Sequence, residues 1–232
     1  MQKAICKVLI LPIKRLADDQ SEMVSQMLYG ESCELIEQDG LWAKIKMDFD
    51  ETIGWVLLTG LMEVEEIKTK NIVEKPFEYL ESENKIYSIG SEVDFPTQKI
   101  VDVNNVRKSI VDIAKKFLSV PYLYGGRSFF GIDQSAFVQL IFKIHGINLP
   151  RFAKDQSVFG EVLDFIEESQ PGDLAFFDDC DGNINHVGIM LDNFEILHCF
   201  GEVRKDSIDH SGIFNCEQNK HTHKLRFVKR II

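Results

Sequence analysis

Histidines carry the acid–base chemistry that this chain could perform. His186 and His198 lie in the strand-like runs "HVGIML" and "FEILHCF". An imidazole in such a run can transfer protons near neutral pH, although a single histidine on a strand is more often structural. With Asp133 they could also bind a metal ion, because carboxylates and imidazoles are good ligands. No spacing in the sequence supports such a site, so we predict no metal and no cofactor.

The cysteines and two further histidines indicate structural or surface roles. The five cysteines are odd in number and scattered, without CxxC spacing: Cys6, Cys33, Cys180, Cys199 and Cys216. This favours reduced thiols in a cytosolic setting over a disulfide framework or a zinc site. Cys199 directly follows His198, so on a strand it faces the opposite side and we interpret it as a buried structural thiol. His221 and His223 in "HTHK" alternate onto one face, and we expect both at a solvated strand end.

Length, composition and charge bound the class of protein. At 232 residues the chain can form one large domain or two small ones, and 44% hydrophobic and 27% charged residues are ordinary for a globular protein. A formal net charge of −11 argues against nucleic acid and against an anionic membrane surface as partners.

The N-terminal segment shows no targeting pattern. Its apolar run, Val8 to Pro12, lies between Lys7 and Lys14 and is too short for a signal-peptide core or a membrane span. We interpret it as a first β-strand and expect a cytoplasmic protein without membrane insertion. A signal peptide that had already been removed would leave the same sequence, so a periplasmic location is the alternative.

The first 62 residues have an all-β pattern. "SCELIEQDGLWAKIKMD" contains two alternating runs separated by Asp39 and Gly40, and "TIGWVLLTG" follows as a further strand. Several short strands within this length predict a small barrel. Residues 63–104 are charged and irregular, and we interpret them as a connector that packs on either neighbour.

From residue 105 the pattern changes to helices followed by strands. "NNVRKSIVDIAKKFLSV" places its apolar residues on one helical face, with Asn104 or Asn105 as the cap. A second helix follows the "PYLYGG" loop and ends at Gly146. The later runs "DLAFFD", "HVGIML", "FEILHCF" and "KLRFVKRII" predict antiparallel strands, which makes residues 105–232 an α+β domain.

The order "PYLYGGRS", "GIDQSAF", "QPGDLAFF", "HVGIML" and "ILH" resembles the NlpC/P60 cysteine peptidases. More loosely, Trp42 and the "GW" at 54–55 resemble a bacterial SH3 domain. The combination is similar to the γ-D-glutamyl-L-diamino acid endopeptidases, which cut peptidoglycan stem peptides. The resemblance implies an SH3-like domain at 1–62, a connector at 63–104 and a papain-like NlpC/P60 domain at 105–232.

The resemblance also assigns catalytic positions, and at one of them the residue cannot act as the nucleophile. The family's nucleophilic cysteine would be residue 134, which here is Gln134. His186 matches the general base, His198 the third residue that orients it, and Tyr122 a residue beside the oxyanion. A glutamine amide cannot supply the thiolate that the mechanism needs. Ser135 cannot replace it, because the next residue on a helix points about 100° away.

The same resemblance implies residues that bind the substrate. Asp133 and Ser135 would hold the free amine of a murein peptide, with Arg127 nearby and Glu22 contributed by the SH3 domain. Five departures from the family's pattern cluster around this pocket: Phe129, Gln134, Ala136, Phe152 and Phe200 in "HCFG". Such clustering fits natural drift away from catalysis better than a single laboratory substitution.

Three functions follow as hypotheses. The first is a catalytically inactive homologue that binds murein stem peptides such as L-Ala-γ-D-Glu-diamino acid. The second is an active γ-D-glutamyl-L-diamino acid endopeptidase, which requires that Gln134 is not the native residue or that another group attacks. The third is a remnant without a ligand that binds a protein partner.

Overall fold

The computed structural model describes residues 2–68, 70–192 and 194–232. Positions 1, 69 and 193, which fall in the predicted first domain, connector and second domain, lie outside the described residues. The chain forms two compact units. The first contains residues up to Ile100 together with Leu123–Ile132, and the second contains Val101–Tyr122 and Asp133–Ile232.

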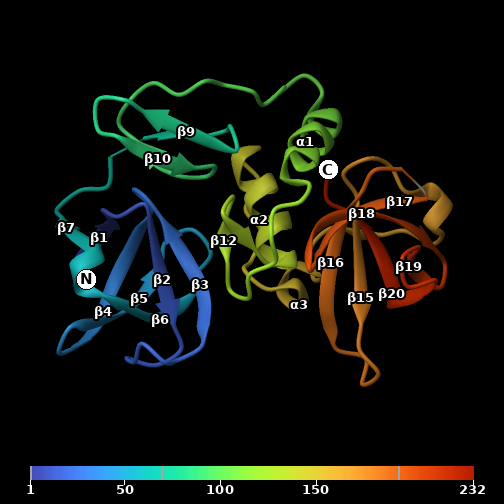
Figure 1. Ribbon diagram of the computed structural model, residues 1–232, viewed down its shortest axis with the longest axis horizontal. Helices are drawn as coiled ribbons and strands as arrows, with labels where there is room; N and C mark the ends of the chain where they lie inside the picture. Colours follow the sequence, from blue (N-terminus) through green and yellow to red (C-terminus); the bar gives the residue numbers. More distant parts are fainter. Residues whose placement is uncertain (1, 69, 193) are drawn as a thin grey trace. The chain divides into compact units, whose positions relative to one another are not determined.

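The first unit is built on a seven-stranded antiparallel sheet, drawn in blue and cyan in Figure 1. Its strands are β1 (Gln2–Cys6), β2 (Ile10–Lys14), β3 (Met23–Leu28), β4 (Ser32–Asp39), β5 (Trp42–Met47), β6 (Ile53–Leu57) and β7 (Leu61–Val64), in the spatial order β3-β2-β6-β5-β4-β1-β7. Side chains alternate between the two faces, as in β5, where Ala43, Ile45 and Met47 are buried. These residues join one apolar core, so the predicted small β-barrel is present.

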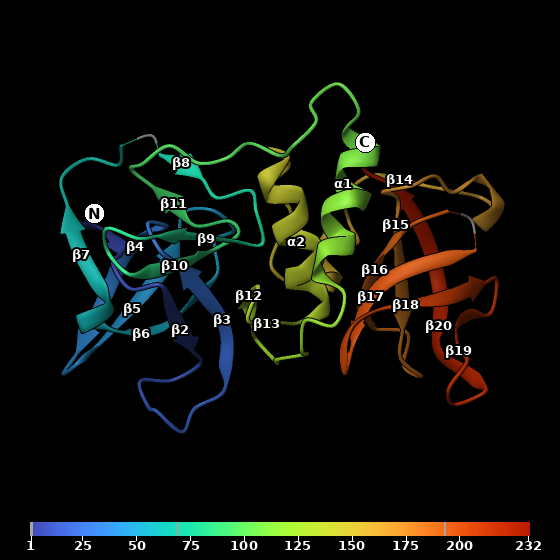
Figure 2. The ribbon, with the colours of Figure 1, turned by 45° about the horizontal axis from the view of Figure 1, so that its top comes forward.

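Much of the predicted connector adds two short strand pairs to this first unit (Figure 2). The pairs are β8 (Asn71–Ile72) with β11 (Glu92–Val93), and β9 (Phe77–Leu80) with β10 (Lys85–Ser88). Val73, Tyr87 and Val93 form a small core on which Leu9 and Tyr29 pack. The segment up to Ile100 therefore packs on the barrel, which settles the choice of neighbour that the sequence left open.

Capping residues and a glycine account for where the helices of the second unit begin and end. α1 (Val106–Ala114) is capped by Asn105, whose side chain accepts a hydrogen bond from the Lys108 amide. α2 (Gln134–Ile144) is capped by Asp133 and followed by Gly146 at a φ of 75°, a left-handed conformation that glycine adopts without strain. α3 (Ala153–Gln156) is a single turn. Among the described residues, no helix is long and apolar enough to cross a membrane.

The strands of the second unit form an antiparallel sheet that closes on itself. They are β14 (Glu161–Val162), β15 (Leu174–Asp178), β16 (Ile184–Met190), β17 (Glu195–Phe200), β18 (Glu202–Asp209), β19 (Gly212–Asn215) and β20 (Lys220–Arg230). The order is β14-β20-β15-β16-β17-β18-β19, and β19 also pairs with β20. α2 packs against β16 and β17, and Gln134 at its start is hydrogen-bonded to Asn185 of β16, so the start of this helix lies close to the strands that carry the predicted histidines. This is the α+β arrangement predicted for the second domain.

Candidate functional site

A cavity of about 340 Å³ lies at the start of α2 in the second unit. It is lined by Tyr122, Gln134, Asn185, His186, Cys199, Phe200, Gly201 and His223. Three of the four catalytic positions implied by the sequence, Tyr122, Gln134 and His186, therefore share one cavity. The fourth, His198, is fully buried and hydrogen-bonded to His186.

Gln134 is the first residue of α2, where the family would carry its nucleophile. Its side-chain amide donates a hydrogen bond of 3.0 Å to the backbone oxygen of Asn185, another lining residue. The glutamine thus joins the start of α2 to the start of β16.

The two residues that flank Gln134 in sequence are buried and bonded to Arg151. Arg151 donates to both carboxylate oxygens of Asp133, and its Nη1 also lies 3.0 Å from Ser135 Oγ. Asp133 is 6% exposed, Ser135 4% and Arg151 2%. The predicted amine-binding pair is therefore held in place by a buried guanidinium.

His186 and His198 belong to a chain of hydrogen bonds that ends on a carboxylate. His186 Nε2 lies 2.9 Å from His198 Nδ1, and His198 Nε2 lies 2.9 Å from Asp206 Oδ2. The three residues come from the neighbouring strands β16, β17 and β18. An ionised carboxylate only accepts hydrogen bonds, so His198 carries its proton on Nε2 and its Nδ1 accepts from His186.

Burial controls the protonation of these groups. Loss of solvent lowers the pKa of His186 well below its usual value and outweighs Asp206 in lowering the pKa of His198. Burial alone would raise the pKa of Asp206, but hydrogen bonds from His198 and Arg204 hold it below its usual value. Both imidazoles are therefore neutral at neutral pH, beside an ionised carboxylate.

His223 also lies at this site, and the expectation of a solvated position for it is wrong. Its ring stacks on that of His186, with centroids 4.1 Å apart and planes 28° apart. Burial lowers the pKa of His223 to about 4. His221, in contrast, is exposed as expected and contacts Asp209.

A β-bulge explains why the two histidines of "HTHK" separate. Ile213 of β19 pairs with His223, whereas the next residue, Phe214, pairs with His221, so Thr222 is the extra residue. Partners across an antiparallel pair share a face, and consecutive residues on β19 face opposite ways. His223 therefore shares the inner face of buried Ile213, while His221 points outward.

The other two lining residues with reactive groups are held in unreactive forms. Burial raises the pKa of the Cys199 thiol to about 12, in agreement with its interpretation as a structural residue. Burial, followed by the charge of Asp133, also raises the pKa of Tyr122. Both groups are therefore protonated at neutral pH.

The two remaining predicted ligand contacts belong to the first unit. Arg127, predicted to lie near the ligand, is 0% exposed and forms two 2.8 Å hydrogen bonds with the Glu31 carboxylate. Its guanidinium thus joins a buried ion pair and is not presented to a ligand. Glu22 is exposed; a hydrogen bond from Tyr124 is the main cause of its lowered pKa, and it also pairs with Arg15.

Three residues of the site were missed in the sequence: Arg151, Asp206 and His223. Arg151 follows the "LP" dipeptide with no spacing that relates it to Asp133. Asp206 lies two residues after Arg204, which pairs directly with His198 across β17 and β18. The one signal in the sequence is the position of Asp206 in "RKDSID", two residues before the apolar Ile208, because alternate residues of a strand share a face.

Two family models match the chain. The model of the NlpC/P60 family matches residues 119–224, which include every residue that lines the cavity. The model of the bacterial dipeptidyl-peptidase Sh3 domain matches residues 15–61, within the first unit. The chain belongs to the NlpC/P60 family of cell-wall peptidases, as its motifs implied.

Its relatives show which activities occur in this family. The chain is 27% identical over 211 residues to a γ-D-glutamyl-L-lysine dipeptidyl-peptidase of Bacillus subtilis (strain 168), covering 75% of this chain and 71% of that protein. It is 34% identical over 105 residues to the probable endopeptidase NlpC of Escherichia coli (strain K12), covering 44% of this chain and 68% of that protein.

A solved structure shares the whole architecture. An NlpC/P60 family protein from Bacillus cereus ATCC 10987 has a TM-score of 0.78 and 20% identity, covering 99% of both chains. At this identity the likeness establishes the fold, an SH3-like barrel followed by a papain-like NlpC/P60 domain.

Proposed function

We propose that this chain is a catalytically inactive NlpC/P60 protein that binds murein stem peptides of the type L-Ala-γ-D-Glu-diamino acid. The observation that carries the proposal is Gln134, an amide at the start of α2 where the family's mechanism needs a thiolate. Its hydrogen bond to the Asn185 oxygen fixes this amide in the cavity. Acyl transfer from a peptide to residue 134 is therefore chemically blocked.

Neighbouring groups offer no substitute nucleophile. The Cys199 thiol, with a pKa of about 12, is protonated at neutral pH and has almost no thiolate to attack with. The Ser135 hydroxyl donates to Asp133 and accepts from Arg151. The base that these contacts place beside the serine proton is the Asp133 carboxylate, and both of its oxygens already accept hydrogen bonds from Arg151.

Three observations support retained binding. The cavity volume of about 340 Å³ falls within the usual range for ligand pockets. Its lining mixes hydrogen-bonding groups, such as Tyr122 and His186, with the apolar ring of Phe200. The Bacillus subtilis relative is named for γ-D-glutamyl-L-lysine peptides, the same chemical class.

The first test is a calorimetric titration of the tripeptide L-Ala-γ-D-Glu-diaminopimelate into the intact chain. We expect a micromolar dissociation constant, equivalent to about −8 kcal/mol, and no cleaved product. The matched control is the same tripeptide N-acetylated on alanine. If Asp133 and Ser135 hold the free amine, acetylation should weaken binding by about tenfold or more, since a charge-assisted contact is lost.

Either of two outcomes would overturn this proposal. Cleavage by the unaltered chain would make it an enzyme. No heat at millimolar tripeptide would remove the binding function and leave the third hypothesis, a remnant that binds a protein partner.

A second candidate function is an active γ-D-glutamyl-L-diamino acid endopeptidase, if Gln134 is not the native residue. The observation in its favour is the complete His186–His198–Asp206 chain, which an acting cysteine would require. The test is Gln134→Cys, with Gln134→Ala as a control that opens the cavity without adding a thiol. Cleavage by the cysteine variant alone would mean that only the nucleophile is missing, whereas cleavage by neither would mean that the cavity itself has diverged.

We also propose a cytoplasmic location, with the periplasm as the alternative. The support is the pair of exposed thiols, Cys180 and Cys216, which persist best in a reducing compartment. Fractionation of cells that express the native gene, followed by immunoblotting, tests this.

A further inference from the structure

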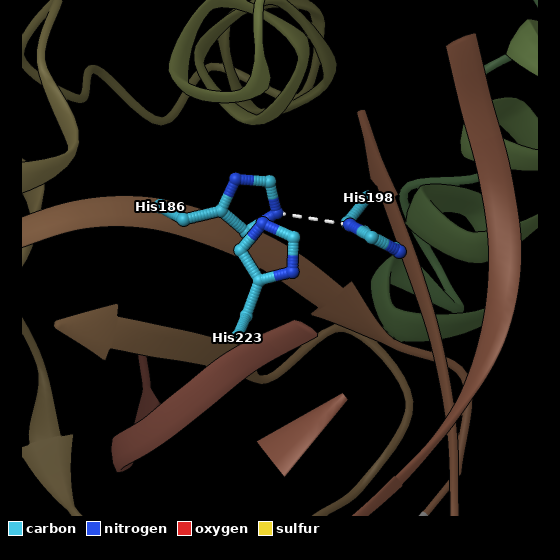
Figure 3. A group of neighbouring side chains, drawn as sticks. All are labelled: His186, His198 and His223. Atoms are coloured by element: carbon cyan, nitrogen blue, oxygen red, sulfur yellow. Dashed lines mark hydrogen bonds between the residues drawn. The ribbon is translucent and has the colours of Figure 1, made fainter. Parts of the chain in front are cut away.

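Three histidines converge beside the cavity, and only two of them belong to the catalytic set implied by the family. His186 comes from β16, His198 from β17 and His223 from β20. One ring nitrogen from each lies within 4.8 Å of those of the other two. Figure 3 shows the three rings gathered around one point, with the His186–His198 hydrogen bond as a dashed line.

Hydrogen bonds at the rear of two rings direct bare nitrogens inward. Asp206 accepts from His198 Nε2, which leaves Nδ1 without a proton. Thr222 Oγ1, which donates to the Ile213 oxygen, lies 2.9 Å from His223 Nδ1 and accepts its proton, which leaves Nε2 bare. A hydrogen-bond acceptor behind the imidazole, most often a carboxylate, a backbone carbonyl or water, is the usual means by which proteins orient a histidine toward a metal ion, and the Thr222 hydroxyl can act as such an acceptor.

We propose that His186, His198 and His223 form a binding site for a Zn²⁺ ion, with water from the cavity as the fourth ligand. Three imidazoles and an open fourth position are an established coordination set for this ion. His186 and His223 line the cavity, which gives the ion a route of entry. This inference goes beyond the peptide-binding proposal and does not rest on it.

The distances require only a small rearrangement. Ligand nitrogens at about 2.0–2.1 Å from zinc in a tetrahedral site lie about 3.4 Å from one another. His186 Nε2 and His198 Nδ1 are already 2.9 Å apart, so this pair opens slightly while the His223 ring moves closer.

The proton balance is simple. Zinc replaces the hydrogen between His186 and His198, so the Nε2–H bond of His186 breaks and a Zn–N bond forms. The proton moves to Nδ1 of the same ring, which points away from the other two rings in Figure 3. All three imidazoles then bind as neutral ligands, and no oxidant or reductant is needed.

The test is a titration of the full chain with ZnCl₂ against a competing chromogenic chelator, in the presence of a phosphine reductant. We expect one ion per chain with a dissociation constant in the micromolar range or tighter. His223→Phe keeps an aromatic ring against His186 but removes a ligand, and should weaken binding by at least about 100-fold, more than the loss of an outer-shell partner usually costs. Asp206→Asn should weaken it by about 10- to 100-fold.

The matched control is His221→Phe, because His221 lies two residues away on the same strand but faces solvent. Its affinity for zinc should equal that of the unaltered chain. A second control, Cys180→Ser with Cys216→Ser, removes the two exposed thiols, which could also attract zinc. Loss of zinc binding in either control, or unchanged binding in His223→Phe, would place the ion elsewhere and overturn the proposal. Absence of zinc binding by the unaltered chain would also overturn it.

A measurement on the unaltered chain covers the case in which His223→Phe fails to fold. In a ¹⁵N-labelled sample, zinc should shift the ring nitrogens of His186, His198 and His223. The rings of His145, His210 and His221 serve as internal references and should not move. Shifts confined to the reference rings would contradict the site, whatever the fate of the peptide-binding proposal.

Discussion

At the residue scale, the side chain at position 134 decides whether the cavity contains a nucleophile. The start of a helix carries a partial positive charge that stabilises an anion such as a thiolate. The Gln134 amide gains nothing from this field and instead donates to the Asn185 oxygen. His186 and His198 nevertheless remain bonded in series to Asp206, which satisfies polar groups that would otherwise be buried without partners. This chain of hydrogen bonds thus gives both histidines a structural role that does not depend on a nucleophile at position 134.

We expect Asp206→Asn to lower the free energy of unfolding by about 1–3 kcal/mol, because His198 and Arg204 lose a charged partner in the interior. Urea denaturation followed by circular dichroism measures the loss. Asp209→Asn is the matched control, since Asp209 is an exposed carboxylate that also contacts a histidine, His221, and should change stability little. Equal losses in both variants would contradict a special role for the buried chain.

The buried thiols predict how stability varies at alkaline pH. Burial raises the pKa of Cys6, Cys33 and Cys199 to about 12, against about 8.5 in an unfolded chain. Between these values the unfolded chain releases protons that the folded chain keeps, so stability falls as pH rises. The slope should reach at most about 1.4 kcal/mol per pH unit for each thiol. Urea denaturation at pH 8, 9 and 10 measures it, and Cys33→Ala should make it shallower.

At the element scale, β20 shows what a sequence reading can and cannot predict. The strand itself, like α1, α2 and the β4–β5 turn, could be predicted from periodicity and turn residues. The extra residue at Thr222 could not, because a period of two assumes regular pairing with a partner whose register is unknown. His223 was misplaced for this reason alone.

A buried ion pair, Arg127–Glu31, contributes to joining the hairpin of β12 (Arg127–Ser128) and β13 (Gly131–Ile132) to the barrel. Arg127→Met should lower the free energy of unfolding of the first unit by about 3–5 kcal/mol, because Glu31 stays buried without its cation. Arg127→Met with Glu31→Gln should recover most of the loss, since no charge is then left unpaired. Chemical denaturation of both variants measures this.

A surface pair provides the comparison. Lys46→Met breaks the exposed contact with Glu51 in the same unit and should change stability little. If the double variant were as unstable as Arg127→Met, packing and not an unpaired charge would be the cause.

At the scale of the whole molecule, the two units are not two successive stretches of sequence. Leu123–Ile132 belongs to the first unit, although the chain on both sides of it belongs to the second. The motifs and their order could be predicted from the sequence, because they are local. The pairs Arg127–Glu31 and Asp133–Arg151 could not, since each joins positions whose proximity only the folded chain creates.

This interleaving predicts the behaviour of an isolated Val101–Ile232 fragment. In the full chain the Arg127 and Phe129 amides donate to Gln26 and Ser88, which the fragment lacks. Hydrogen exchange at these two amides should therefore be slow in the full chain and fast in the fragment. The Phe137 amide, which donates to the Asp133 oxygen, should remain slow in both. Slow exchange at Arg127 and Phe129 in the fragment would mean that the hairpin folds without the barrel.

The Arg127–Glu31 pair also constrains how such genes can diversify. The two codons lie 96 positions apart, so recombination that swaps the N-terminal half between diverged lineages separates them. A chimera that keeps one charge without the other buries it alone, and selection against unfolded chains removes it. Related genes should therefore gain or lose both residues together. Recombination between such genes should favour crossover points that transfer the β12–β13 hairpin together with the barrel.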